Sequence, residues 1–161
     1  MSYSRSNVIP LGFQELNFHY RTSNATSNSD KWIPTISGGS SSGVGTYTVQ
    51  AGLSVREGLR TDVCFEISWS GHTGTGDLLI DVPYKIQKSV DDSDRFIFSG
   101  SVSLGNISMG SATYAVLQAV PDTYLLKIVL CESGAAETDL QMTTSGTLRG
   151  SISYAGQREE Y

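Results

Sequence analysis

The sequence has little of what several protein classes require. Its two cysteines, Cys64 and Cys131, match no zinc motif and are too few for a disulfide framework, so we expect two free thiols. Its apolar runs fall well short of the roughly 18–20 residues that span a bilayer. The first thirty residues also lack the pattern of a signal peptide. We therefore expect no membrane insertion, and synthesis in a reducing compartment.

Basic charge is also scarce. The net charge is −5, and the 11 lysines and arginines are dispersed along the chain. Binding to phosphates requires clustered basic side chains, so this distribution opposes a role in binding nucleic acid or an anionic membrane surface.

Residues suited to catalysis are few. The two histidines, His19 and His72, cannot build a histidine-based metal site. The glycine-rich run at residues 71–76 lacks the lysine of a phosphate-binding loop. Three carboxylates at residues 91–94 lack the spacing of a calcium loop and fit a solvated turn better. We predict no enzyme activity, no metal and no cofactor.

Small polar residues dominate what is present. The 161 residues include 24 Ser, 14 Thr and 17 Gly, about a third of the chain, together with 15 aromatic residues. Aromatic and β-branched side chains suit a pleated surface, and glycine suits tight turns. This composition predicts an all-β domain.

Alternating apolar and polar residues predict the strands. On the clearest strand, Trp69 shares a face with Val63, Phe65 and Ile67, so we expect it in the core. We favour a strand over a helix for residues 111–120. The spacing of the strands indicates an antiparallel β-sandwich or jelly roll. The other predicted strands are residues 61–69, 77–82, 95–104, 124–131 and 147–154.

The first 31 residues are predicted to form an extended N-terminal arm and linker ahead of a domain at residues 32–161. The arm is too short to bury its own apolar side chains, which are Phe13, Leu16, Phe18 and Tyr20. Residues 16–21 alternate as a half-buried strand does. Two interpretations stand: the arm packs on its own domain as an extra strand, or it anchors the chain to a partner.

The order of several short motifs resembles a known family. Residues 32–39 and 45–52 are followed by Val55-Arg56-Glu57-Gly58, the strand ending at Trp69, a G-T-G loop and Pro83-Tyr84. This succession resembles the C-terminal β-sandwich, or knob, domains of bacteriophage tail fibres, head fibres and other virion structural proteins. Leu53 stands where that family usually has an aromatic residue.

The resemblance implies a homotrimeric virion protein, made in the host cytoplasm and carried on the particle exterior. The arm would attach it to another virion protein of the tail, baseplate or capsid. A loop with His72, Thr73 and Thr75 would bind a host surface glycan. The apolar strand at residues 124–131 is typical of a strand buried on both sides or at a subunit interface. The trimer would cover its face formed by Leu125, Lys127, Val129 and Cys131.

The alternative function is that of a capsid decoration, or cement, protein whose arm clamps neighbouring capsid subunits. A glycan-processing enzyme is the least favoured hypothesis, since it requires paired carboxylates or a histidine in a deep pocket.

Overall fold

The computed structural model describes residues 29–88 and 98–157. Within these ranges every regular element is a strand, so the all-β, antiparallel prediction is confirmed. The strands are β1 (Ser29–Trp32), β2 (Ile36–Gly38), β3 (Thr46–Glu57), β4 (Arg60–Ser70), β5 (Leu78–Asp81), β6 (Ser99–Gly105), β7 (Tyr114–Ala119), β8 (Leu125–Cys131), β9 (Thr138–Asp139) and β10 (Gly146–Ala155).

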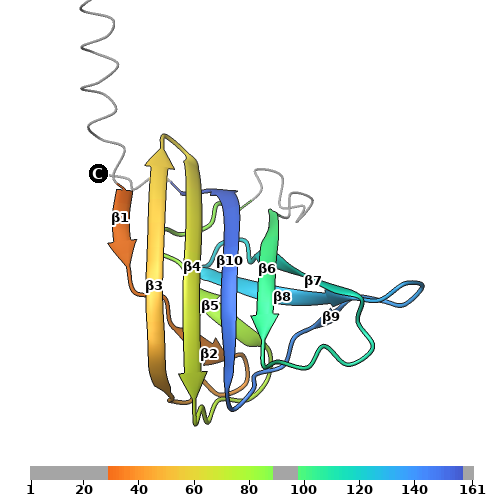
Figure 1. Ribbon diagram of the computed structural model, residues 1–161. Helices are drawn as coiled ribbons and strands as arrows, with labels where there is room; N and C mark the ends of the chain where they lie inside the picture. The colour runs from red at the N-terminus through yellow and green to blue at the C-terminus, as the bar shows by residue number, and fades with distance from the viewer. Residues whose placement is uncertain (1–28, 89–97, 158–161) are drawn as a thin grey trace, which may run out of the picture.

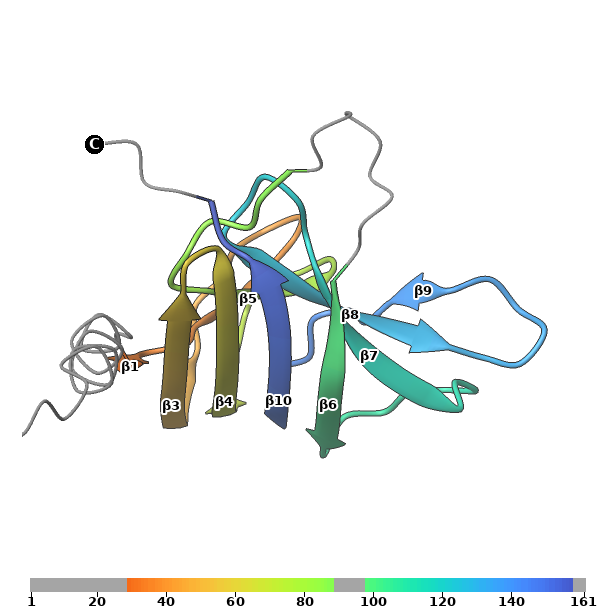
Figure 2. The same ribbon diagram turned by 90° about the horizontal axis from the view of Figure 1, so that it is seen from above.

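All ten strands belong to one curled antiparallel sheet. Its order is β1-β3-β4-β10-β6-β7-β8-β5-β2, and β9 pairs with β8. In Figure 1, β3, β4, β10 and β6 stand upright at the front, while β7, β8 and β5 cross behind them. We call these two groups the front strands and the rear strands. Figure 2 shows the curl from above, with the turn between the two groups at β6 and β7.

The core lies between the front and rear strands. Along β4, residues 61, 63, 65, 67 and 69 are buried and alternate with more exposed residues. The same alternation runs along β10, where Leu148, Ile152 and Tyr154 face inward. Because successive side chains of a strand point to opposite faces, β4 and β10 each turn an apolar face to the core and a polar face outward. Trp69 is 3% exposed, which confirms that it belongs to the core.

Side-chain hydrogen bonds help to close the curl. Beyond β1, the chain passes beside the first half of β3, where Tyr47 and Gln50 contact it. The Tyr47 hydroxyl donates to the Ile36 carbonyl at 3.2 Å and accepts from the Ile36 amide at 3.1 Å. Gln50 Nε2 donates to the Pro34 carbonyl at 3.0 Å. The two ends of the sheet therefore come together at β3.

Most predicted strands match observed ones. The strands predicted at residues 61–69, 77–82, 124–131 and 147–154 correspond to β4, β5, β8 and β10, and β7 confirms the strand favoured within 111–120. β6 covers the second half of the strand predicted at 95–104, whose first residues lie outside the described ranges. The predicted boundary between residues 31 and 32 falls inside β1.

Tyr154 makes the stability of the fold sensitive to alkaline pH. Its hydroxyl donates to the Tyr84 carbonyl at 3.1 Å, and its side chain is 2% exposed. Burial, the largest cause, raises the pKa of Tyr154 well above its usual value of 10. The folded chain therefore keeps a proton that the unfolded chain releases above pH 10. We expect the unfolding free energy to be unaffected below pH 10 and to fall above it, by up to about 1.4 kcal/mol per pH unit.

Denaturant unfolding between pH 8 and 12 measures this effect. Tyr154→Phe should flatten the alkaline slope and cost about 1 kcal/mol at neutral pH, because the hydrogen bond to Tyr84 is lost. Tyr124→Phe is the control, since this side chain is 54% exposed. An unchanged slope in Tyr154→Phe would contradict the assignment.

Candidate functional site

Two glycine-rich loops meet at the end of the sheet where β4 ends and β3 begins, at the bottom of Figure 1. They are residues 38–45, which precede β3, and residues 71–76, which follow β4. We call them together the loop cluster. It contains the three residues that the sequence singled out for ligand binding: His72, Thr73 and Thr75.

Backbone hydrogen bonds join the two loops. Thr73 donates its amide to the Val44 carbonyl at 3.0 Å, and the Val44 amide donates to Thr73 Oγ1 at 3.1 Å. Thr75 exchanges bonds with Ser41: its amide donates to the Ser41 carbonyl at 3.1 Å, and its carbonyl accepts from the Ser41 amide at 3.2 Å. A third segment joins the cluster, because the His72 amide donates to the Thr144 carbonyl at 2.9 Å. The loops are thus held as one unit.

Glycine is required where these loops touch. A Cβ at Gly43 would lie 2.0 Å from the Gly74 nitrogen, and a Cβ at Gly38 would lie 2.3 Å from the Thr75 carbonyl oxygen. Gly43 also has a φ of 68°, a left-handed conformation that a Cβ disfavours. Gly38 and Gly43 therefore allow the close backbone packing of the two loops.

His72 lies inside the cluster. Its ring is 5% exposed and packs against Gly45 and Gly74, where Cβ atoms would come within 2.6 and 2.9 Å of ring carbons. Nδ1 accepts the Gly74 amide at 3.0 Å, so the proton of the neutral ring is on Nε2. Nε2 is buried with no hydrogen-bond partner within the described residues. The His72 ring is therefore enclosed by the two loops and supports them from within, and its part in ligand binding stays a prediction.

The surface of the cluster consists of hydroxyls around one apolar side chain. Thr73 and Thr75 are exposed, as are Ser40, Ser41 and Ser42. Val44 is 74% exposed among them. Trp69 cannot add a stacking surface, because it is buried and its Nε1 donates to the Thr143 carbonyl at 2.9 Å. Such a surface can exchange hydrogen bonds with a hydroxyl-rich ligand, and it offers neither charge nor an aromatic platform.

His72 gives a direct test of how the cluster is supported. His72→Ala removes the acceptor of the Gly74 amide and leaves a void, so we expect a loss of about 2 kcal/mol in unfolding free energy. His72→Asn keeps a side-chain acceptor that can reach the amide two residues on, so it should lose clearly less. Denaturant unfolding and amide exchange at Gly74 measure both effects. Equal losses in the two variants would show that the hydrogen bond is unimportant.

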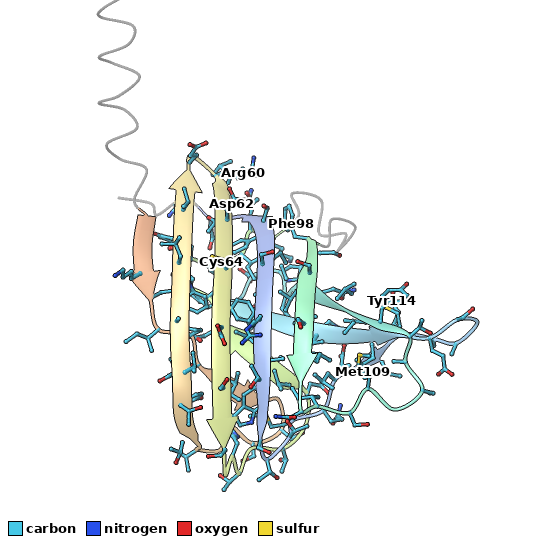
Figure 3. All side chains as sticks on the ribbon, in the orientation of Figure 1. Arg60, Asp62, Cys64, Phe98, Met109 and Tyr114 are labelled. Carbon is cyan, nitrogen blue, oxygen red and sulfur yellow. The ribbon has the colours of Figure 1, made fainter. Side chains whose placement is uncertain are left out.

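The outer face of the front strands is the second feature of interest. Small polar residues alternate along β10 and β6, where Ser101 and Ser151 hydrogen-bond at 3.1 Å. Figure 3 shows Asp62 and Cys64 on β4 at this face. Arg149 and Glu66 form a 2.8 Å ion pair there, which raises the pKa of Arg149.

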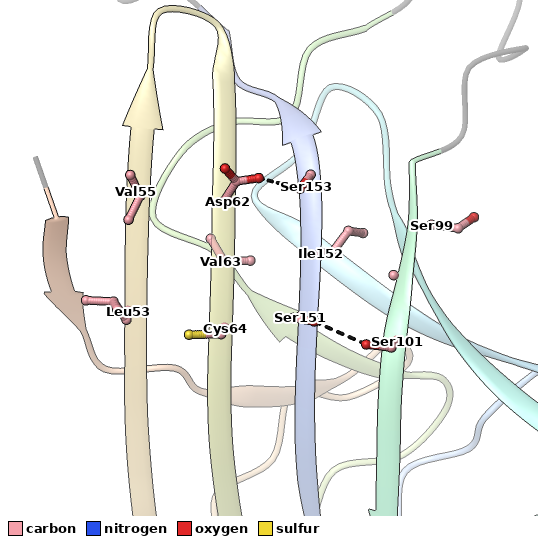
Figure 4. Close-up of a pocket in the computed structure, with 11 residues that line it drawn as sticks. Leu53, Val55, Asp62, Val63, Cys64, Ser99, Ser101, Ser151, Ile152 and Ser153 are labelled. Atoms are coloured by element: carbon pink, nitrogen blue, oxygen red, sulfur yellow. Dashed lines mark hydrogen bonds between the residues drawn. The ribbon is translucent and has the colours of Figure 1, made fainter. Parts of the chain in front are cut away.

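A shallow depression lies on this face between β3 and β6 (Figure 4). Leu53 and Val55 form its apolar side, and Cys64, Ser151 and Ser101 lie in one row across β4, β10 and β6. Leu53 is 42% exposed. A second depression adjoins it over β1 and β3 and is bordered by Ile33, which is 71% exposed. Sequence patterns along single strands could not predict this apolar surface, because it extends across the sheet from β1 to β3.

The predicted trimer face on β8 is partly covered within a single chain. Val129 is 2% exposed and Cys131 is 7% exposed. Leu125 and Lys127 are half-buried, and Lys127 pairs with Asp139 at 3.0 Å. Val129 and Cys131 therefore offer little surface to a second subunit.

Two exposed tyrosines lie at the two ends of this strand and were not singled out from the sequence. Tyr114, which is labelled in Figure 3, lies on β7 opposite Cys131 of β8. It is 57% exposed. A side-chain hydrogen bond to Cys131 is the largest cause that raises the pKa of Tyr114. Tyr124, just before β8, is 54% exposed. Both cysteines are free thiols, as predicted.

Several predicted features lie outside the described residues. These are the anchor residues Phe13, Leu16, Phe18 and Tyr20, and the acidic run at residues 91–94. In residues 29–88 and 98–157, no three His, Cys, Asp or Glu side chains gather closely enough to hold a metal ion. The same two ranges contain no helix that is long and apolar enough to cross a membrane.

Comparison of the chain with protein-family models, curated proteins and solved structures gave no match.

Proposed function

We propose that this chain is a non-enzymatic structural protein of a bacteriophage particle. It is a knob-like module that attaches to the particle exterior by its N-terminal arm and binds a host surface glycan through the loop cluster. The observation that carries this proposal is the rigid presentation of hydroxyls at one end of the sheet. The motif order within residues 32–84, which resembles phage fibre knobs, gives the proposal its biological setting.

The construction of the loop cluster supports recognition of a polar ligand. Two loops joined by several backbone hydrogen bonds lose little conformational freedom when a ligand binds, which preserves affinity. Thr73 and Thr75 are exposed on a loop that buried His72 supports from within. Uncharged hydroxyls can both donate and accept hydrogen bonds, as sugar hydroxyls require.

We propose further that the curled sheet functions as a β-sandwich knob within a homotrimer. The rear strands supply the subunit contact, through half-buried Leu125 and Lys127 and the exposed rings of Tyr114 and Tyr124. Aromatic residues are enriched at protein interfaces, which supports this placement. Sedimentation at micromolar concentration should give three times the chain mass, and Tyr114→Ser with Tyr124→Ser should give the mass of one chain.

A glycan array with the fluorescently labelled protein tests the ligand proposal. We expect retention on bacterial surface glycans, and a loss of about tenfold or more in Thr75→Val, since one unpaired ligand hydroxyl costs at least 1.4 kcal/mol. Thr113→Val is the matched control, being an exposed threonine just before β7. Absence of retention for the wild-type protein would reject glycan binding. Equal losses in both variants would place the ligand elsewhere.

The second candidate function is a capsid decoration protein. Exposed Ile33 and Leu53, with half-buried Val55 beside them on the outer face, favour it, because this surface suits side-on packing against another protein. Electron cryomicroscopy of the particle distinguishes the two functions. A decoration protein would lie with this face on the capsid, whereas a knob would project away from its attachment point.

A further inference from the structure

In the part of the chain that the structure describes, β1 is an edge strand of the sheet. Strand β1 pairs with β3 on one side, from Ser29 opposite Val55 to Trp32 opposite Gly52. It stands at the end of the strand order and at the left of Figure 1. In an antiparallel pair, alternate residues direct their backbone groups away from the partner strand. Among the described residues, no strand pairs with the other edge of β1, which can therefore accept an added strand.

Apolar surface lies on the outer face beside this edge. Ile33, one residue beyond β1, is 71% exposed, and Leu53 on β3 is 42% exposed. Both residues line the second depression together with Lys31 and Ala51. An added strand would cover this surface only if its own apolar side chains faced the same side.

The sequence immediately before β1 supplies such a strand. Twenty-eight residues precede Ser29, and within them Leu16, Phe18 and Tyr20 alternate with polar residues. Six residues in extended form cover about 20 Å, more than the length of β1. The residues between this segment and β1 are rich in Ser, Thr and Asn and can form a hairpin loop.

We propose that residues 16–21 add to the sheet as a strand antiparallel to β1 of the same chain. The register is the one that places the apolar side chains of the added strand on the same face as exposed Ile33. With Phe18 opposite Lys31 and Leu16 opposite Ile33, all three apolar side chains lie on the outer face and cover Ile33. A shift by one residue would place Asn17, His19 and Arg21 there instead. This register leaves residues 22–28 as the loop.

This inference concerns the free chain and does not depend on the proposed function. It gives a free subunit a way to shield the apolar side chains of its arm from water. If the arm also attaches the subunit to a particle, attachment would first require release of this strand. Failure of the arm to dock would leave glycan binding by the loop cluster untouched, and failure of glycan binding would leave docking untouched.

Disulfide trapping tests the register in the full-length chain, in a Cys64→Ser background that removes the exposed native thiol. Phe18→Cys with Lys31→Cys places two cysteines directly opposite each other on one face, within disulfide reach. His19→Cys with Lys31→Cys is the matched control, because its two side chains point to opposite faces. We expect the first pair to oxidise at least about tenfold faster and to give an intramolecular disulfide on non-reducing gels. Equal rates would overturn the proposal, as would a covalent dimer, which would assign the strand to a neighbouring copy.

Amide exchange gives an independent measurement. In the wild-type chain we expect slow exchange at all the amides of β1, with those that face the open edge protected by the added strand. Leu16→Ser with Phe18→Ser should make only the edge-facing amides exchange about tenfold faster or more, with the β3-facing amides unchanged. Rapid exchange at the edge-facing amides of the wild-type chain would overturn the proposal.

Discussion

Gly43→Ala should disrupt the loop cluster and abolish ligand binding. The new Cβ would lie 2.0 Å from the Gly74 nitrogen, closer than any real contact, so one of the two backbones must move. The φ of 68° adds the cost of a left-handed alanine, about 1–2 kcal/mol. With the overpacking cost of about 1–3 kcal/mol, we expect a total loss of about 3 kcal/mol in unfolding free energy. Denaturant unfolding measures this loss.

Gly71→Ala separates the two causes of this loss. Gly71 has a φ of 64°, close to that of Gly43, and belongs to the same cluster, but a Cβ there meets nothing within 4 Å. The substitution therefore carries the left-handed cost alone, about 1–2 kcal/mol. The difference in unfolding free energy between the two variants is the cost of forcing a Cβ into the contact between the loops. Similar losses in both variants would mean that the loops do not pack closely in solution.

The same pair of variants connects the cluster to its proposed function. If Gly43→Ala separates the loops, Thr73 loses its partner Val44 and the arrangement of exposed hydroxyls is lost. Gly71→Ala leaves these contacts in place and should retain binding on the glycan array. Retention by both variants would show that the ligand does not require the joined loops.

Much of the fold could be predicted because a β-strand leaves a local pattern in the sequence, the alternation of apolar and polar residues. The alternation of Val63, Phe65, Ile67 and Trp69 identifies the buried face of β4, and all four residues are buried. Short strands such as β1, β2 and β9 carry too few residues for such a pattern, and they are defined by their partners. The curl itself depends on long-range pairing, such as that between β6 and β7, which no local pattern encodes.

The candidate site was harder to predict for a related reason. The sequence placed His72, Thr73 and Thr75 together in one loop but gave no sign that residues 38–45 would pack on it. That packing buries His72, whose ring accepts a hydrogen bond from the Gly74 amide and so supports the loop. Val129 and Cys131 are a similar case, because both are already buried within the single chain. Burial at these positions depends on the order of the strands in the sheet. That order cannot be predicted from the spacing of residues along the sequence.

Leu148→Ala should cause one of the largest losses of stability in the chain. Leu148 is fully buried on β10, between Ile67 of β4 and Leu104 of β6 in the same row of the sheet. Truncation removes apolar contacts and leaves a cavity among strands that cannot collapse without breaking their pairing. We expect a loss of about 2–5 kcal/mol in the free energy of unfolding, measured by denaturant titration. That is a large part of the 5–15 kcal/mol typical of a whole domain.

Leu53→Ala is the matched control on the opposite face of the sheet, since it is the same substitution at a side chain that is 42% exposed. In a chain whose outer face meets only water, it should cost no more than about 0.5 kcal/mol. A loss close to that of Leu148→Ala would mean that another surface covers Leu53 in solution. The concentration dependence of the loss then identifies that surface: a loss independent of protein concentration points to the chain's own arm, and a loss that varies with concentration points to a second copy. The pair of variants therefore measures both the strength of the core and the state of the outer face.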